Sequence, residues 1–184
     1  FTAFIEPIAA EFGWSYAHIS LGASLRGLEM GLLAPLGGFL VDRLGPRRVS
    51  ITGAVFISLG LFLLGQTNSL VLYYLSFVAI AAGLGFTTQA VILPAVSNWF
   101  RKRVGLASGI AISGFGFGGL LIPAIVKLID LYGWRLALSI MALGELLIVV
   151  PLALLLRHKP EQFGYLPDGD SEDPVNTSST LTFQ

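Results

Sequence analysis

The feature that most constrains this chain is a long stretch without charge, which runs from Val49 to Phe100 and contains no Asp, Glu, Lys or Arg. A polar cluster at residues 65–69, with the sequence GQTNS, interrupts it near the middle. An α-helix rises about 1.5 Å per residue, so each half of the stretch, if helical, is long enough to cross about 30 Å of hydrocarbon. The stretch therefore predicts two membrane-spanning helices joined by a short polar turn.

The composition also favours a membrane protein. Charged residues make up 12% of the 184 residues and hydrophobic residues 54%, whereas soluble domains carry about 25% charged residues. The net charge is zero and there is no basic arm, so we expect no nucleic-acid partner. Cysteine is absent and the two histidines, His18 and His158, lie far apart, so we expect neither a metal site nor a cofactor.

Apolar segments and turn residues divide the chain into six predicted spans and a tail. The first apolar segment, about residues 1–10, is too short to cross a membrane, so we expect a truncated first helix. Ser15 follows Gly13-Trp14 and can cap the next helix. The complete spans are expected at about 15–41, 49–65, 70–96, 104–131 and 134–156, which makes residues 1–156 one helical bundle. Residues 157–184, which are rich in polar residues and proline, are predicted to be a linker.

Basic residues lie in alternate predicted loops and so indicate an orientation. The loops that carry them contain Arg43, Arg47, Arg48, Arg101, Lys102, Arg103, Arg157 and Lys159. By the positive-inside rule these loops, and with them the linker, face the cytoplasm. We therefore expect a multi-pass protein of the plasma membrane, with the lipid bilayer around it.

Residues 38–48, with the sequence GFLVDRLGPRR, place four charges between two apolar segments. An acid at a helix end, a glycine that can take positive φ and a basic cluster predict a tight, charged hairpin. Two interpretations are open at this point. The charges can act as a topology anchor, or they can have a specific conformational function.

The same residues resemble the signature loop of the major facilitator superfamily of secondary transporters, roughly Gly-x-Leu-Ala-Asp-Arg-x-Gly-Arg-Arg/Lys between the second and third helices. The positions that match are Gly38, Leu40, Asp42, Arg43, Gly45, Arg47 and Arg48. Val41 and Pro46 depart from the pattern. The resemblance implies an all-α membrane protein of the major facilitator fold, of which this chain is the six-helix N-terminal bundle without the C-terminal six-helix half.

In that family the loop is an interlock that breaks and reforms during transport. Carried over to this sequence, the resemblance implies a conformational interlock at Gly38, Asp42, Arg43, Gly45, Arg47 and Arg48. Its partner is expected in the missing C-terminal half. The acid that pairs with the arginine in the family would lie at the end of the fourth helix, where this chain has Ser97 and Asn98.

Residues 99–118, with the sequence WFRKRVGLASGIAISGFGFG, resemble a segment of the monocarboxylate and oxalate/formate-type porters within this superfamily. The resemblance implies a small organic anion as substrate, a mono- or dicarboxylate, with protons as a candidate coupling ion. Four glycines of the segment form two pairs with a spacing of four residues, which places both glycines of a pair on one helix face, where a neighbouring helix can approach closely. These predicted helix-packing glycines are Gly105, Gly109, Gly114 and Gly118.

Three polar residues inside the predicted spans are candidates for the substrate path. Arg26 lies near mid-membrane, where an arginine costs about 2.5–3.5 kcal/mol on insertion scales. It can pair with Glu29 on the same helix, or it can attract a carboxylate substrate with its planar guanidinium. Thr88 and Gln89 can bind a carboxylate through hydrogen bonds or can join neighbouring helices.

The expected function is secondary active transport of a small organic anion by alternating access. We do not expect an enzyme, because the sequence has neither a nucleotide-binding loop nor a catalytic triad. Two alternatives stay open. The chain can belong to a transporter of another solute class, or to a membrane sensor or regulator that uses the same helices without transporting.

Overall fold

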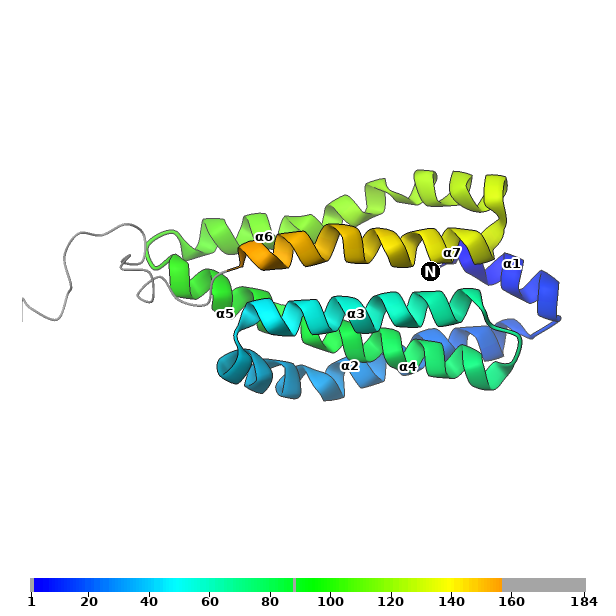
Figure 1. Ribbon diagram of the computed structural model, residues 1–184, viewed down its shortest axis with the longest axis horizontal. Coiled ribbons are helices and arrows are strands. Elements are labelled where there is room, and N and C mark those ends of the chain that lie inside the picture. Colours follow the sequence, from blue (N-terminus) through cyan, green and yellow to red (C-terminus); the bar gives the residue numbers. More distant parts are fainter. Residues whose placement is uncertain (1, 88, 157–184) are drawn as a thin grey trace, which may run out of the picture.

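The computed structural model describes residues 2–87 and 89–156, and every regular element in these ranges is an α-helix. The helices form an elongated bundle (Figure 1). In chain order they are α1 (Thr2–Phe12), α2 (Tyr16–Leu44), α3 (Pro46–Gly65), α4 (Leu70–Thr87), α5 (Gln89–Trp99), α6 (Val104–Leu120) and α7 (Ile122–Leu155). The predicted linker, residues 157–184, lies outside the described residues.

Judged by length and composition, three helical stretches of the described residues could cross a membrane: Pro46–Gly65, Leu70–Thr87 and Val104–Leu155. The third stretch has 52 residues, more than twice the length that one crossing needs. It is divided at Gly133, whose φ of 77° and ψ of 158° are not helical. Residues 122–132 continue the direction of α6, whereas residues 134–155 run back beside α3 (Figure 1).

Several helix boundaries differ from the expected spans: α3 begins at Pro46, and the span expected at 70–96 corresponds to α4 and α5, which together extend to Trp99. Residues 104–131 were expected as one helix, but α6 ends at Leu120 and α7 begins at Ile122. Pro123, in the first turn of α7, has no N–H to donate to the preceding turn, so the regular helix cannot continue through it. Helix α2 continues to Leu44, beyond the expected end at residue 41.

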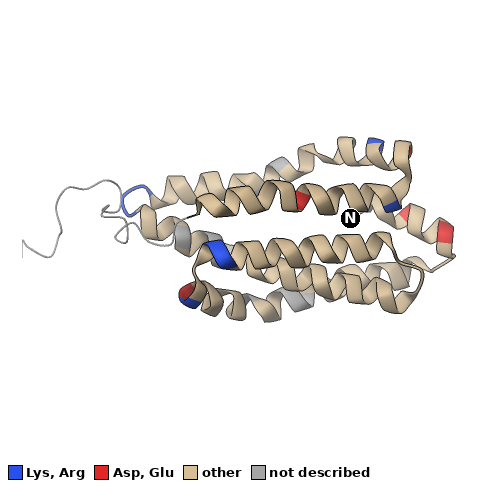
Figure 2. Cartoon of the chain, viewed as in Figure 1, with Lys and Arg blue, Asp and Glu red and all other residues tan. Residues whose placement is uncertain are grey.

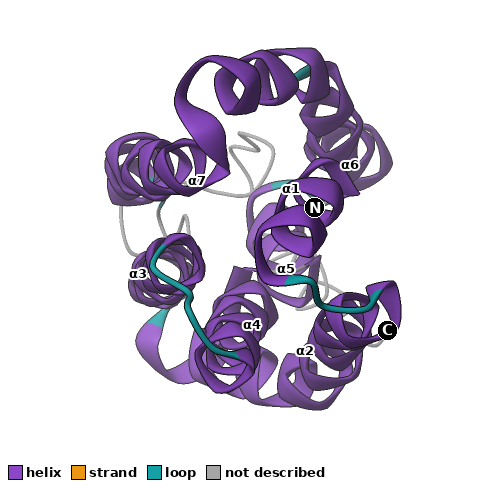
Figure 3. Cartoon of the chain, turned by 90° about the vertical axis from the view of Figure 1, so that its right-hand side faces the viewer, coloured by secondary structure: helices purple, strands orange, loops and turns teal. Residues whose placement is uncertain are grey.

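The helices are arranged as an arc with α1 on its inner side. Helix α4 packs against α2 and α3, and α3 also packs against α7. Figure 3 shows α2, α4, α3 and α7 following one another around the arc when the bundle is seen from one end. Helix α6 is more loosely attached, through α5 and α7. Helices α2, α3, α4 and α7 are therefore the framework that positions the rest.

Two glycines of α4 allow close approach on both of its sides. A Cβ atom added at Gly83 would lie 2.6 Å from the carbonyl oxygen of Gly53 and 2.7 Å from the backbone nitrogen of Ile57, both in α3. A Cβ atom at Gly85 would lie 2.8 Å from the Cβ of Leu33 in α2. Residues two positions apart on a helix point in nearly opposite directions, about 200° apart. Gly83 therefore faces α3, while Gly85 faces α2.

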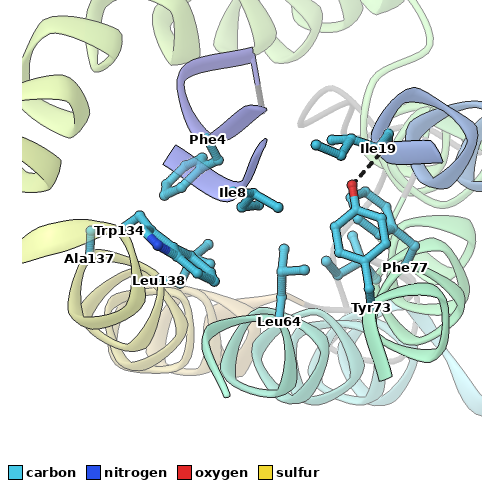
Figure 4. Packing of buried hydrophobic residues seen from close by; sticks show 10 residues of the cluster. Phe4, Ile8, Ile19, Leu64, Tyr73, Phe77, Trp134, Ala137 and Leu138 are labelled. Atoms are coloured by element: carbon cyan, nitrogen blue, oxygen red, sulfur yellow. Dashed lines mark hydrogen bonds between the residues drawn. The ribbon is translucent and has the colours of Figure 1, made fainter. Parts of the chain in front are cut away.

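The main hydrophobic core lies where α1 meets the arc (Figure 4). Ile8 of α1 is completely buried, and Phe4 is nearly so. These side chains point toward buried residues of α3, α4 and α7 (Figure 4). The buried members of this core are Phe4, Ile8, Ile19, Leu64, Tyr73, Phe77, Ile80, Trp134, Ala137 and Leu138.

We predict that Gly83→Ala destabilises the protein by about 1–3 kcal/mol, because the new methyl group meets backbone atoms that cannot move aside cheaply. Thermal unfolding of the purified full-length protein in detergent, followed by tryptophan fluorescence, should show a lower midpoint. Gly144→Ala is the matched control, since a Cβ there has nothing within 4 Å and alanine favours the helix. Equal midpoints for the two variants would contradict the α3–α4 contact.

Candidate functional site

A single glycine makes the reversal between α2 and α3. Gly45 has a φ of 80° and a ψ of 157°, and its backbone N–H donates to the carbonyl oxygen of Val41 at 2.9 Å. Pro46 begins α3, where its fixed φ suits the helix and its missing N–H costs no hydrogen bond. The four charges of the predicted hairpin therefore lie in the adjoining helical turns. These residues are Asp42 and Arg43 in α2, and Arg47 and Arg48 in α3.

Apolar contacts hold this charged turn in place. Val41 and Val49 are 3% and 2% exposed, and they pack with Leu40 and with Phe86 of α4. Val41, which departs from the signature pattern, thus has a buried packing role. The backbone of the turn is fixed against α4 while its charged side chains stay on the surface.

All four charged side chains of the turn are exposed. Asp42 makes no ion pair with any described residue. Gly45, at the N-cap of α3, provides no side-chain hydrogen bond to the helix. The guanidinium of Arg43 lies 4.5 Å from the ring centroid of Phe39, a cation–π contact on its own helix. The turn therefore presents an acid and three bases that the described residues do not neutralise.

Three of these charges lie at helix ends where the helix dipole disfavours their sign. Asp42 is near the C-terminus of α2, and Arg47 and Arg48 are in the first turn of α3. A charge of the adverse sign at a helix end costs about 0.3–1 kcal/mol at low ionic strength. Helix stability therefore gives no reason for this pattern. Contact with a partner outside the two helices, or with the membrane surface, gives a reason for this charge pattern.

The basic residues of the charged turn share one end of the bundle with those of the α5–α6 loop (Figure 2). That loop contains Arg101, Lys102 and Arg103, all exposed. We call this end the basic end. The α1–α2 turn, the α3–α4 turn and the bend within α7 lie at the other end (Figure 1). We call it the glycine–tryptophan end, because the first turn contains Gly13-Trp14 and the bend contains Gly133-Trp134.

The three substrate-path candidates are less completely described. Arg26 and Glu29 belong to α2, but their side chains lie outside the described residues, so the predicted ion pair stays a prediction. Thr88 lies outside the described residues altogether. Gln89 begins α5, and its side chain is also outside the described part of the chain.

The predicted packing glycines of α6 face open space in the described part of the chain. A Cβ atom added at any of them would meet nothing within 4 Å. These positions are Gly105, Gly109, Gly114 and Gly118. Large apolar side chains on α6, such as Leu106 and Ile110, are also exposed. Their packing role is therefore a prediction about a partner outside the described residues.

A charged cluster at the glycine–tryptophan end was not predicted from the sequence. Arg135 Nη2 and Nε donate to Glu11 Oε1 at 2.8 Å and 3.2 Å. Trp134 Nε1 donates to Glu11 Oε2 at 2.7 Å. Arg135 Nη1 also donates to the carbonyl oxygen of Gly65, at 3.0 Å. One arginine thus connects the end of α1, the end of α3 and the start of the returning segment of α7.

The electrostatics of this cluster favour an ionised Glu11. The hydrogen bond from Arg135 holds the pKa of the Glu11 carboxyl below its ordinary value; desolvation opposes this shift, and the hydrogen bond from Trp134 adds to it. The guanidinium also stacks 4.6 Å from the ring centroid of Trp134. The only sequence signal was that each charge lies two residues from the glycine of a Gly-Trp pair, Glu11 before Gly13 and Arg135 after Gly133.

Two tyrosines fix the start of α2 to α4 at the same end. Tyr73 Oη donates to the carbonyl oxygen of Ile19 at 2.9 Å, and Tyr74 Oη donates to that of His18 at 3.1 Å. Ser15 is the N-cap of α2 and accepts from the His18 backbone N–H at 3.4 Å, which confirms its predicted role. The two tyrosines thus join α4 to the start of α2.

Comparisons with known proteins agree with this arrangement. The chain matches the Major Facilitator Superfamily over residues 1–179. It is 34% identical to monocarboxylate transporter 13 of Rattus norvegicus over 154 residues, which cover 83% of this chain and 36% of that protein. It is 25% identical to the oxalate:formate antiporter of Oxalobacter formigenes over 162 residues, or 88% of this chain and 38% of that protein.

A third relative has a different substrate in its name. The chain is 33% identical to riboflavin transporter RibJ of Trypanosoma brucei brucei over 153 residues, which cover 79% of this chain and 27% of that protein. The chain thus spans roughly a third of the length of the relatives it matches. Since the match to the family extends over nearly all of its 184 residues, this chain belongs to the Major Facilitator Superfamily.

Proposed function

We propose that this chain is the N-terminal half of a secondary active transporter that moves a small organic anion by alternating access. The observation that carries the proposal is the charged turn of residues 38–48, which matches the signature loop and presents an acid, Asp42, that the described residues leave unpaired. Family membership supports transport, and the arc of apolar helices supports a multi-pass membrane protein. Two relatives whose names denote carboxylate transport support an anionic substrate.

In this proposal the basic end faces the cytoplasm at the plasma membrane, and the linker of residues 157–184 lies on the same side. The asymmetry of the basic residues supports this orientation. The C-terminal half of the transporter covers the open glycines of α6. The exposed apolar side chains of that helix support an interface there, because close helix packing in membranes uses small residues.

The charged turn acts as the interlock between the two halves. Asp42 accepts hydrogen bonds from the N-terminal end of a helix in the other half, where a negative charge is favourable. Arg43 pairs with an acid when the halves close at the basic end, while Gly38 and Gly45 permit the close approach. Arg47 and Arg48 hold the turn at the anionic membrane surface.

The substrate contacts are assigned to residues whose side chains lie outside the described part of the chain. Arg26 attracts the carboxylate, since its guanidinium can donate two parallel hydrogen bonds to it. Thr88 and Gln89 donate further hydrogen bonds, and protons are the proposed coupling ion. The riboflavin transporter among the relatives favours one alternative, a transporter of another solute class.

The full-length protein in proteoliposomes should take up radiolabelled mono- or dicarboxylates with saturable kinetics. Arg26→Ala should raise the KM by about tenfold or more, because a charge-assisted hydrogen bond contributes about 1.5–3 kcal/mol. Arg26→Lys should be intermediate, since lysine keeps the charge without the planar fork. Uptake of riboflavin but not of carboxylates would support the alternative solute class, and ligand binding without uptake would indicate a sensor.

Asp42→Asn should shift the full-length transporter away from the outward-open state, because the amide lacks the charge that the interlock requires. Labelling of engineered cysteines on each side of the membrane measures the population of the two states. Asp130→Asn is the matched control, an exposed acid in the α6-proximal segment of α7. The interlock would be disproved if the two asparagine variants labelled alike.

A further inference from the structure

Helix α7 carries an acid in the middle of its returning segment. Residues 134–155 contain two charged residues, Arg135 at the start and Glu145 near the centre (Figure 2). A helix rises about 1.5 Å per residue, so Glu145 lies about 15 Å from either end of this segment. Because the hydrocarbon layer is about 30 Å thick, its carboxyl group lies near mid-membrane depth. An ionisable side chain is costly at that depth, and in membrane proteins it marks an ion or proton path.

Glu145 lies on the face of α7 that packs against the bundle. Residues seven apart on a helix differ by only about 20° in direction, so Glu145 shares a face with the buried Leu138. Figure 4 shows Leu138 among the core side chains. Leu143 and Leu147, two positions to either side of Glu145, point about 200° away and are 58% and 65% exposed. The half-buried Glu145 is therefore turned toward the inner side of the arc.

The described residues of α3, the helix that packs most extensively against α7, include no charge at this level. Ser58 Oγ donates to the carbonyl oxygen of Ala142 at 2.7 Å, within one turn of Glu145, so Ser58 marks the level of α3 that Glu145 faces. The two arginines of α3, Arg47 and Arg48, are in its first turn at the basic end. They begin at least about 15 Å along the helix from Ser58.

The other helices that contact α7 also leave Glu145 without a nearby cation. Helix α6, Val104–Leu120, contains no charged residue. The remaining titratable groups of α1 and α7 lie toward the glycine–tryptophan end (Figure 2); they are Glu6, Glu11, Lys127, Asp130, Tyr132 and Arg135. Within the described part of the chain, Glu145 thus makes no ion pair. An ionised carboxylate is unneutralised in these surroundings, whereas a protonated carboxyl group carries no charge.

We propose that Glu145 is the proton-binding residue of this transporter, which takes up one proton together with one carboxylate and releases both on the other side. This role rests on the proposed function, in which protons are the coupling ion. When Glu145 is ionised, its charge repels an anionic substrate on the inner side of the arc. Transfer of a proton from water to its carboxylate oxygen removes that charge, so the anion binds after the proton. Loss of the proton to water on the other side restores the repulsion and favours release of the anion.

An imposed proton gradient separates driven transport from exchange. The probe is radiolabelled lactate, a small monocarboxylate, with the full-length protein in proteoliposomes. If one proton accompanies each anion, a gradient of about one pH unit supports up to about a tenfold accumulation. Glu145→Gln has nearly the same size but cannot exchange a proton. It should abolish the accumulation while exchange of lactate across the membrane persists.

Two further variants exclude a general effect of substitution. Glu145→Asp keeps a titratable group and should restore part of the accumulation. Glu6→Gln is the matched control, the same acid-to-amide change at an exposed position of α1. It should accumulate lactate as the unmodified protein does.

The affinity for lactate should depend on pH through the same residue. Because the anion binds after the proton, the affinity of the unmodified protein should fall as the pH rises. Above the midpoint of the site the fall should approach about tenfold per pH unit, the value for one linked proton. Glu145→Gln should make the affinity nearly constant over the same range.

Infrared difference spectroscopy without substrate tests the proton site independently of transport. During a pH titration, the C=O stretch of a protonated carboxyl group should disappear as the pH rises, and Glu145→Gln should remove this band. A Glu145 that stays protonated at every pH would overturn the proposal, as would one that is ionised throughout because a cation elsewhere in the transporter pairs with it. Accumulation by Glu145→Gln at the level of the unmodified protein would also overturn it.

Failure of the proposed function gives a different pattern. The infrared band of Glu145 would then titrate, while the unmodified protein would take up no carboxylate. If Glu145→Gln does not fold, Glu145→Asp supplies the comparison, since the band should remain and its titration midpoint should move. A band with an unmoved midpoint in Glu145→Asp would belong to another carboxyl group and would overturn the assignment to Glu145.

Discussion

The structure depends on how closely the backbone of α4 approaches the helices on its two sides. Besides Gly83 and Gly85, Gly60 of α3 permits this contact, since a Cβ there would lie 2.8 Å from the carbonyl oxygen of Ser76. In a membrane, lipid is as apolar as leucine, so helices associate through close packing and polar bonds rather than through the hydrophobic effect. The buried bond from Ser58 to the Ala142 carbonyl group extends this framework to α7. The arc of α2, α4, α3 and α7 is therefore one closely packed unit.

The two ends of this unit have opposite properties. At the glycine–tryptophan end, Arg135 and two tyrosines tie the helix ends to one another through hydrogen bonds. At the basic end, the charged turn is held by apolar packing around Val41 and Val49, and its charges stay exposed. The unit is thus joined by hydrogen bonds at one end and carries exposed charges at the other. This agrees with membership of a superfamily of transporters.

Local patterns made much of the fold predictable. Helix α3 ends at Gly65 and α4 begins at Leu70, on either side of the polar cluster that the sequence marks as a turn. The ion pair of Glu11 with Arg135 could not be predicted, because its members are separated by 124 positions in sequence. The sequence also does not show which glycines contact another helix. The glycines of α6 face open space among the described residues, whereas Gly83 touches the backbone of α3. The side chains of the substrate-path candidates lie outside the described residues.

The most direct test of this account is the distance across the arc in the working transporter. Spin labels at Leu32 in α2 and Leu143 in α7, both exposed, can be measured by pulsed electron paramagnetic resonance with and without substrate. The account predicts one unchanged distance distribution for this pair, while the distance from Leu143 to a label in the second half of the full-length protein changes. A displaced mean or a second population for the pair within the arc would show that the helices do not move as one body, and would contradict the account.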